Sequence, residues 1–173
     1  MDANLRALFK SPLPDACGMF ILQRPQNSCL SSAGKPSGST MTSLIFDTCV
    51  LVCHLRGEDE RCTRYIEQAA HGDLEGFVSS VTVAELYAGE RLSAESESTV
   101  DSLLDAFTVL AVDRAAAAQA GRLVRRFRRS HGLGMLDAVI AATALLEESP
   151  VLTMNTRHFA PVPGLVVVNP LAD

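Results

Sequence analysis

From Ser43 onward, short apolar runs alternate with longer segments whose apolar residues recur at helical spacing. The short runs predict strands near residues 44–46, 76–81, 108–112, 151–154 and 165–168. The longer segments predict helices near residues 48–55, 61–71, 82–91, 100–107, 113–130 and 135–148. Alternating strands and helices are typical of an α/β domain with a mostly parallel sheet. The sequence therefore predicts an α/β fold, a three-layer α/β/α sandwich with a mostly parallel central sheet.

The first forty residues differ from the rest of the chain. Residues 1–40 contain four prolines, and residues 28–40 are rich in Ser and Gly. This composition predicts a disordered extension. Met41 directly precedes the first predicted strand, so an upstream start codon is a second explanation of the extension. We expect residues 41–173 to form a single folded domain.

The charge and cysteine content of the chain limit its partners and its compartment. The net charge is −5, and no Lys follows Lys35. Acidic chains are not the usual nucleic-acid binders, so such a role would need a local basic patch or metal ions. Five cysteines without a Cys-x-x-Cys pair indicate neither a disulfide framework nor a zinc ribbon, and they fit a reducing cytoplasm. No apolar run is long enough to span a membrane.

Three acidic residues stand among apolar segments, where a protein core would not place them. Asp47 follows the first predicted strand, Glu85 lies early in the helix after the second strand, and Asp137 begins a helix that is apolar all round. Each has a structural alternative. Asp47 and Asp137 would cap their helices, with Asp137 also answering the helix dipole, and Glu85 would complete a capping box with Thr82. The functional interpretation places the acids near the carboxyl edge of the sheet, where such sheets bind ligands.

Three carboxylates at one edge would repel one another unless a cation lay between them. Hard divalent cations bind oxygen ligands, and Mg²⁺ typically takes few carboxylates together with water and phosphate oxygens. Such a cation lowers the pKa of water and neutralises charge on a leaving oxygen, which suits hydrolysis of a phosphodiester. The acids therefore favour metal-dependent phosphodiester chemistry.

Four segments in order along residues 43–170 carry a resemblance to a known family. They are Phe46-Asp47-Thr48, Val83-Ala84-Glu85-Leu86 with Gly89, Asp137-Ala-Val-Ile-Ala-Ala-Thr-Ala, and Leu152-Thr153-Met154-Asn155 with His158-Phe159. The chain resembles PIN-domain ribonucleases, most of all the VapC-type toxins of toxin–antitoxin pairs. The resemblance implies a dimeric, Mg²⁺- or Mn²⁺-dependent endoribonuclease of the cytoplasm that an antitoxin holds inactive. It also implies that Asp47, Glu85 and Asp137 are the metal-binding acids.

Asn155 is the one departure from the family pattern. The family often has a fourth acid at this place, whereas Asn brings no charge. An Asn still binds metal-held water, so we include Asn155 among the candidate catalytic residues and leave open whether one or two metal ions bind. The alternative is that Asn155 is a turn residue that closes the preceding strand.

Five arginines gather on one predicted helix, at positions 122, 125, 126, 128 and 129. Most repeat at helical spacing, out of phase with the apolar residues. They form either a solvated face, helped by the dipole preference for cations near a helix C-terminus, or a surface for RNA phosphates or for an acidic partner segment. The four histidines show no ligand spacing, and we expect none of them to be the general base.

Other α/β functions fit poorly. A haloacid-dehalogenase-type phosphatase needs a second Asp two residues after its nucleophile, but position 49 is Cys, and a receiver domain needs a Lys near its last strands. A dinucleotide-binding fold needs a Gly-rich turn where Asp47 stands. The stronger alternative to a nuclease is a non-catalytic PIN-fold module that binds RNA or a protein.

Overall fold

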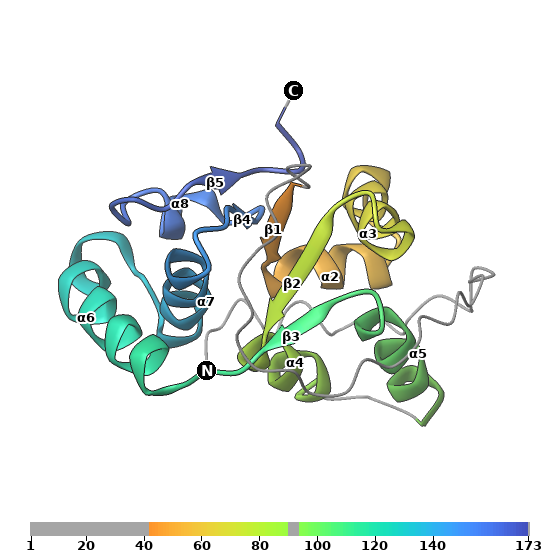
Figure 1. Cartoon of the computed structure of the whole chain (residues 1–173), viewed down its shortest axis with the longest axis horizontal. Coiled ribbons are helices and arrows are strands. Elements are labelled where there is room, and N and C mark those ends of the chain that lie inside the picture. The colour runs from red at the N-terminus through yellow and green to blue at the C-terminus, as the bar shows by residue number, and fades with distance from the viewer. Residues whose placement is uncertain (1–41, 90–93, 173) are drawn as a thin grey trace, which may run out of the picture.

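The computed structural model describes residues 42–89 and 94–172. The prediction for residues 1–40 lies outside the described residues. Strands and helices alternate along the chain as the sequence predicts (Figure 1). The elements are β1 (Ser43–Phe46), α2 (Thr48–Leu55), α3 (Glu60–His71), β2 (Glu75–Ser79), α4 (Ser80–Tyr87), α5 (Ala94–Leu104), β3 (Thr108–Leu110), α6 (Arg114–His131), α7 (Met135–Leu146), β4 (Val151–Leu152), α8 (Thr156–Phe159) and β5 (Val167–Val168).

The five strands form one parallel sheet in the order β3-β2-β1-β4-β5. In β1, Ile45 pairs with Phe77 on one side and with Val151 on the other. The chain first builds outward from β1 to β3 and then returns to place β4 on the opposite side of β1. The order of strands therefore reverses between β1 and β4, which is where parallel sheets form their ligand crevice.

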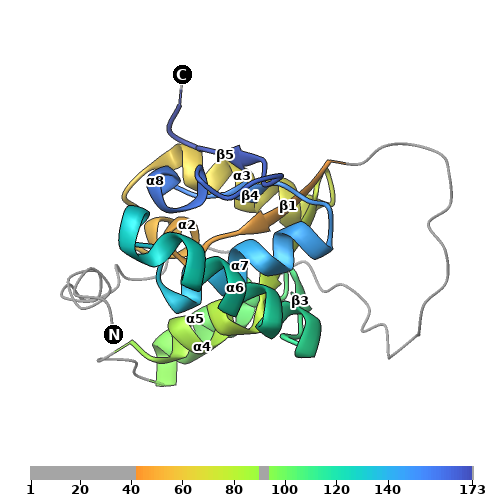
Figure 2. The same ribbon diagram turned by 90° about the vertical axis from the view of Figure 1, so that its left-hand side faces the viewer.

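Alternation of side chains along β1 divides the core into two halves. Leu44 and Phe46 pack into one cluster with residues of α2, α3 and α5. Ile45 packs into the other, with residues of α6, α7 and α8. Figure 2 shows α6 and α7 in front of the strands, on the side away from α3. This arrangement confirms the three-layer α/β/α sandwich.

Both ends of α6 carry ordinary capping residues. The carboxylate of Asp113 accepts a hydrogen bond from the backbone N–H of Ala116 at 2.8 Å. The helix ends at Gly132, whose φ of 73° is a left-handed conformation that glycine adopts without strain. Leu123 and Phe127 are buried on its inner face. The amphipathic character predicted for this helix is confirmed.

The boundary between β2 and α4 differs from the prediction. The strand ends at Ser79, and α4 begins at Ser80 rather than near Thr82. The Ser79 side chain accepts a hydrogen bond from the backbone N–H of Val81, so Ser79 is the N-cap. Thr82 therefore lies inside the helix, and the predicted capping box with Glu85 is wrong. The short helix α8 was also not predicted.

None of the helices in the described ranges combines the length and the apolar character needed to cross a membrane.

Candidate active site

Asp47 lies at the carboxyl end of β1, on the side where β4 is its neighbour. Its backbone N–H donates to the carbonyl of Leu152 at 3.0 Å. Asp47 occupies the N-cap position of α2, yet its side chain makes no capping hydrogen bond. Instead its Oδ2 accepts hydrogen bonds from Thr153 Oγ1 at 2.6 Å and from Cys49 Sγ at 3.1 Å. The carboxylate is thus held by Cys49 and by the segment that follows β4, and the capping alternative is wrong.

Burial makes ionisation of Asp47 unfavourable. The residue is only 5% exposed. Burial raises the pKa of this carboxyl, and the negative charge of Asp137 adds to the increase. The hydrogen bonds from Thr153 and Cys49 act in the opposite direction, because they stabilise the carboxylate. Asp47 is a buried acid held by neutral donors.

Glu85 faces the same region from α4. It is buried, and Thr48 Oγ1 donates a hydrogen bond to its Oε2. Burial raises the pKa of Glu85 to about 7, and the charges of Asp47 and Asp137 contribute to the increase. The Thr48 hydrogen bond offsets this in part. Glu85 is therefore placed by tertiary packing near the other two acids.

Asp137 is the third residue of α7, whose N-cap is Gly134. The N-cap alternative for Asp137 is therefore wrong, although an acid in the first turn does favour the helix dipole. Asp137 Oδ2 lies 2.8 Å from Nδ1 of His158, which is buried. The Asp137 side chain is 21% exposed, so it is the most accessible of the three acids to solvent.

The contacts of His158 define its tautomer. Arg157 donates from Nε to His158 Nε2 at 3.2 Å, so Nε2 must carry the lone pair. In the neutral ring the proton is then on Nδ1, which donates it to Asp137. The side-chain Nδ2 of Asn155 lies 2.7 Å from the same nitrogen, and turning the amide over would place its oxygen there as a second acceptor. His158 thus orients Asp137.

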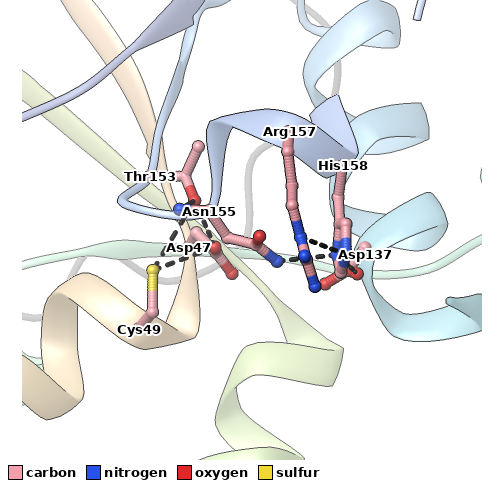
Figure 3. A network of polar contacts seen from close by, with 7 residues as sticks. All are labelled: Asp47, Cys49, Asp137, Thr153, Asn155, Arg157 and His158. Carbon is pink, nitrogen blue, oxygen red and sulfur yellow. Dashed lines mark hydrogen bonds and ion pairs between the residues drawn. The ribbon is translucent and has the colours of Figure 1, made fainter. Parts of the chain in front are cut away.

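Asn155 links the two halves of the site. Its backbone N–H donates to Thr153 Oγ1 at 2.9 Å, and that hydroxyl donates in turn to Asp47. Its side chain extends the other way, toward His158 and Asp137, as Figure 3 shows. Asn155 occupies the N-cap position of α8 but makes no side-chain capping bond. A single segment after β4 therefore connects Asp47 with Asp137.

The donor atoms fit a hard divalent cation. Carboxylate oxygens are the ligands that Mg²⁺ and Mn²⁺ prefer, and the charges of Asp47 and Asp137 both act on Glu85. One turn before Glu85, the buried Thr82 Oγ1 has no hydrogen-bond partner within residues 42–89 and 94–172. In those ranges no three His, Cys, Asp or Glu side chains already stand as one ligand cluster. The site therefore suits a cation with one or two direct carboxylate ligands and water for the rest.

Four neighbours of the acids are not identified as site residues by the sequence. Thr48, Cys49 and Thr153 supply hydrogen bonds to Glu85 or Asp47. Thr48 and Cys49 follow Asp47 directly, so a polar pair at the start of an apolar helix was an available signal. His158 stands in one of the segments that carry the family resemblance, but its contact with Asp137 spans 21 residues of sequence and was not predicted.

Comparison with known proteins shows which family the chain belongs to. Residues 44–165 match the family model described as the PIN domain. The chain belongs to the PIN-domain family. Ribonuclease VapC19 from Mycobacterium tuberculosis is 37% identical over 123 residues, which cover 70% of this chain and 95% of that protein. All four predicted site residues of this PIN domain lie within the matched segment.

Solved structures share the fold. VapBC2 from Rickettsia felis, crystallised with a DNA fragment from its promoter, has a TM-score of 0.64 at 22% identity, over 74% of this chain and 98% of that chain. A toxin–antitoxin complex from Klebsiella pneumoniae has a TM-score of 0.59 at 25% identity, over 75% and 99% of the two chains. The predicted resemblance to VapC-type PIN domains is confirmed.

Proposed function

We propose that this PIN domain is the toxin of a toxin–antitoxin pair and that it hydrolyses RNA phosphodiester bonds with the help of Mg²⁺ or Mn²⁺. The observation that carries the proposal is the mutual repulsion of three carboxylates. Burial and the charges of Asp47 and Asp137 together raise the pKa of Glu85 to about 7. Proteins accept such electrostatic costs at functional sites, and a bound cation would relieve the repulsion among the three carboxylates.

Asp47 and Asp137 would hold the cation, and Glu85 would either join them or orient a water molecule. A bound divalent cation supplies a Lewis acid that activates water and neutralises charge on the leaving oxygen. Thr153 and His158 fix the two metal-binding carboxylates by donating hydrogen bonds to them. The residues of this chain thus supply negative charge at defined positions, with neutral donors behind it.

The partners in this proposal are inferred from the names of the similar proteins. One is named a ribonuclease and another is a toxin–antitoxin complex, which supports an RNA substrate and a cognate antitoxin. We also propose a homodimer that acts in the cytoplasm, because the resemblance to VapC-type toxins implies it. Neutral Asn155 favours a single tightly held cation over two.

The test is cleavage of total cellular RNA by the purified chain, free of antitoxin. We expect discrete fragments with Mg²⁺ or Mn²⁺ and none with EDTA, Asp47→Ala or Asp137→Asn. The exposed Asp105→Asn is the matched control and should cleave like the unaltered protein. Cleavage that survives both EDTA and Asp137→Asn would refute the mechanism. RNA binding without any cleavage would favour the non-catalytic PIN-fold module.

A further inference from the structure

The outer face of α6 carries five arginines, which we call the arginine face. All five are exposed, and none forms an ion pair within the part of the chain that the structure describes. Arg122 donates to Gln119, and Arg126 lies 5.0 Å from the ring centre of Phe127. The members of the arginine face are Arg122, Arg125, Arg126, Arg128 and Arg129.

The arginine face is electrostatically unfavourable in the free protein. Residues three and four apart on a helix are neighbours, so Arg125 repels both Arg122 and Arg129. Each such pair of like charges costs a few tenths of a kcal/mol. The helix dipole compensates only near the C-terminal turn. In a chain of net charge −5 without Lys after Lys35, this concentration of cations indicates an anionic partner.

The arginine face leads to the acidic site. Helix α6 ends at Gly132, where an added Cβ would lie 3.8 Å from His158 Nε2. His158 contacts Asp137, and the exposed Arg157 stands beside it (Figure 3). Figures 1 and 2 both show α6 alongside α7, the helix that carries Asp137. Positive charge therefore continues from α6 to the edge of the acids.

We propose that the arginine face binds the phosphate backbone of single-stranded RNA next to the bond that is cut. This inference rests on the proposed function and adds the surface that holds the substrate. The span from Arg122 to Arg129 is about 10 Å along the helix axis, which is long enough for contact with more than one phosphate of a single strand. Guanidinium groups also bind phosphate oxygens in pairs. RNA is favoured over an acidic polypeptide because the face continues into a site built for a phosphodiester.

The experiment measures binding of a fluorescein-labelled single-stranded RNA by anisotropy, in EDTA. Every protein carries Asp137→Asn, which prevents cleavage and lowers repulsion in the site. The test variant adds Arg125→Gln and Arg129→Gln. The control adds Arg64→Gln and Arg114→Gln, which remove the same charge from exposed positions on α3 and on the first turn of α6.

We expect the test variant to bind roughly tenfold more weakly, with the control close to the parent. Between about 50 mM and about 200 mM salt, the slope of log affinity against log salt should fall by about 1.4 in the test variant, because two phosphate contacts are lost. Equal affinities and slopes for test and control would overturn the inference, as would no RNA binding by the parent. Unchanged RNA binding with weaker binding of polyglutamate would overturn it in favour of an acidic polypeptide.

Failure of this inference and failure of the proposed function give different results. RNA binding through the arginine face without any cleavage would refute the proposed function and support the inferred binding surface. Cleavage of RNA with Mg²⁺, together with equal RNA binding by the test and control variants, would support the proposed function and refute the inferred binding surface. Gln and Arg have similar helix propensity, so we expect both variants to fold like the parent. Thermal unfolding checks this.

Discussion

Replacing Glu85 with Gln should stabilise the metal-free protein above neutral pH. Glu85 is buried near two other acids, and its pKa is raised from 4.5 to about 7. The folded state therefore binds a proton more tightly than the unfolded state, so stability is lost as pH rises from about 4.5 toward about 7. Above that window the loss is complete. Glu85→Gln removes the charge and with it this loss.

The size of the effect follows from the shift in the pKa of Glu85. Each unit is worth about 1.36 kcal/mol, so ionised Glu85 costs at most about 3 kcal/mol near pH 8. Water at the rim of the site screens part of this cost, and the amide of Gln must itself be hydrogen-bonded. Thr48 donates to one oxygen of Glu85 and would do the same for the amide oxygen. We therefore expect a net gain of about 1–2 kcal/mol, or roughly 4–7 °C in Tm.

The assay is thermal unfolding in EDTA, near pH 5 and near pH 8. The variant should exceed the unaltered protein near pH 8 and differ little near pH 5. Glu67→Gln, an exposed position on α3, is the control and should show no such dependence on pH. Saturating Mg²⁺ should narrow the gap, because it stabilises the protein that binds it. A Glu85→Gln variant that unfolds at or below the unaltered protein near pH 8 would refute the reasoning.

Three further substitutions test other parts of the structure. Gly76→Ala should destabilise the fold by about 1–3 kcal/mol in urea unfolding, because the new Cβ would lie 2.8 Å from a ring carbon of Phe107; unchanged stability would contradict this packing. Asp113→Ala should cost about 1 kcal/mol by the same measurement, since it removes the N-cap of α6. Thr153→Val should raise the pKa of Asp47 further and weaken Mn²⁺ binding in calorimetry, because the carboxylate loses its hydrogen bond from Thr153; equal Mn²⁺ affinity would contradict this role.

The fold could be predicted because the hydrophobic pattern is clear. Leu44, Ile45 and Phe46 are all buried, as expected of a central parallel strand, while α6 has a sharp division between apolar and charged faces. The end of β2 could not be predicted. Ser79 and Thr82 are both common N-cap residues, and only the packed structure shows that the helix begins after the first of them.

The acids of the site were predictable and their supports were not. Asp47, Glu85 and Asp137 are visible because charge is costly inside apolar segments. His158 stands in one of the segments that carry the family resemblance, but its relation to Asp137 depends on how α8 lies against α7. A contact between segments that are far apart in the sequence depends on tertiary packing. Local sequence patterns do not report such contacts.

The polar residues around the acids reduce the free-energy cost of burying the three carboxylates. Thr48 and Thr153 donate neutral hydrogen bonds to Glu85 and Asp47, which lower the cost of each carboxylate without cancelling its charge, and His158 contacts Asp137. An arginine in their place would neutralise the acids and leave nothing to attract a cation. Asn155 fits the same logic, because a fourth carboxylate between Asp47 and Asp137 would add to the repulsion between them. The site thus keeps its negative charge available for the proposed divalent cation, while the arginines that would suit a polyanion lie outside it on α6.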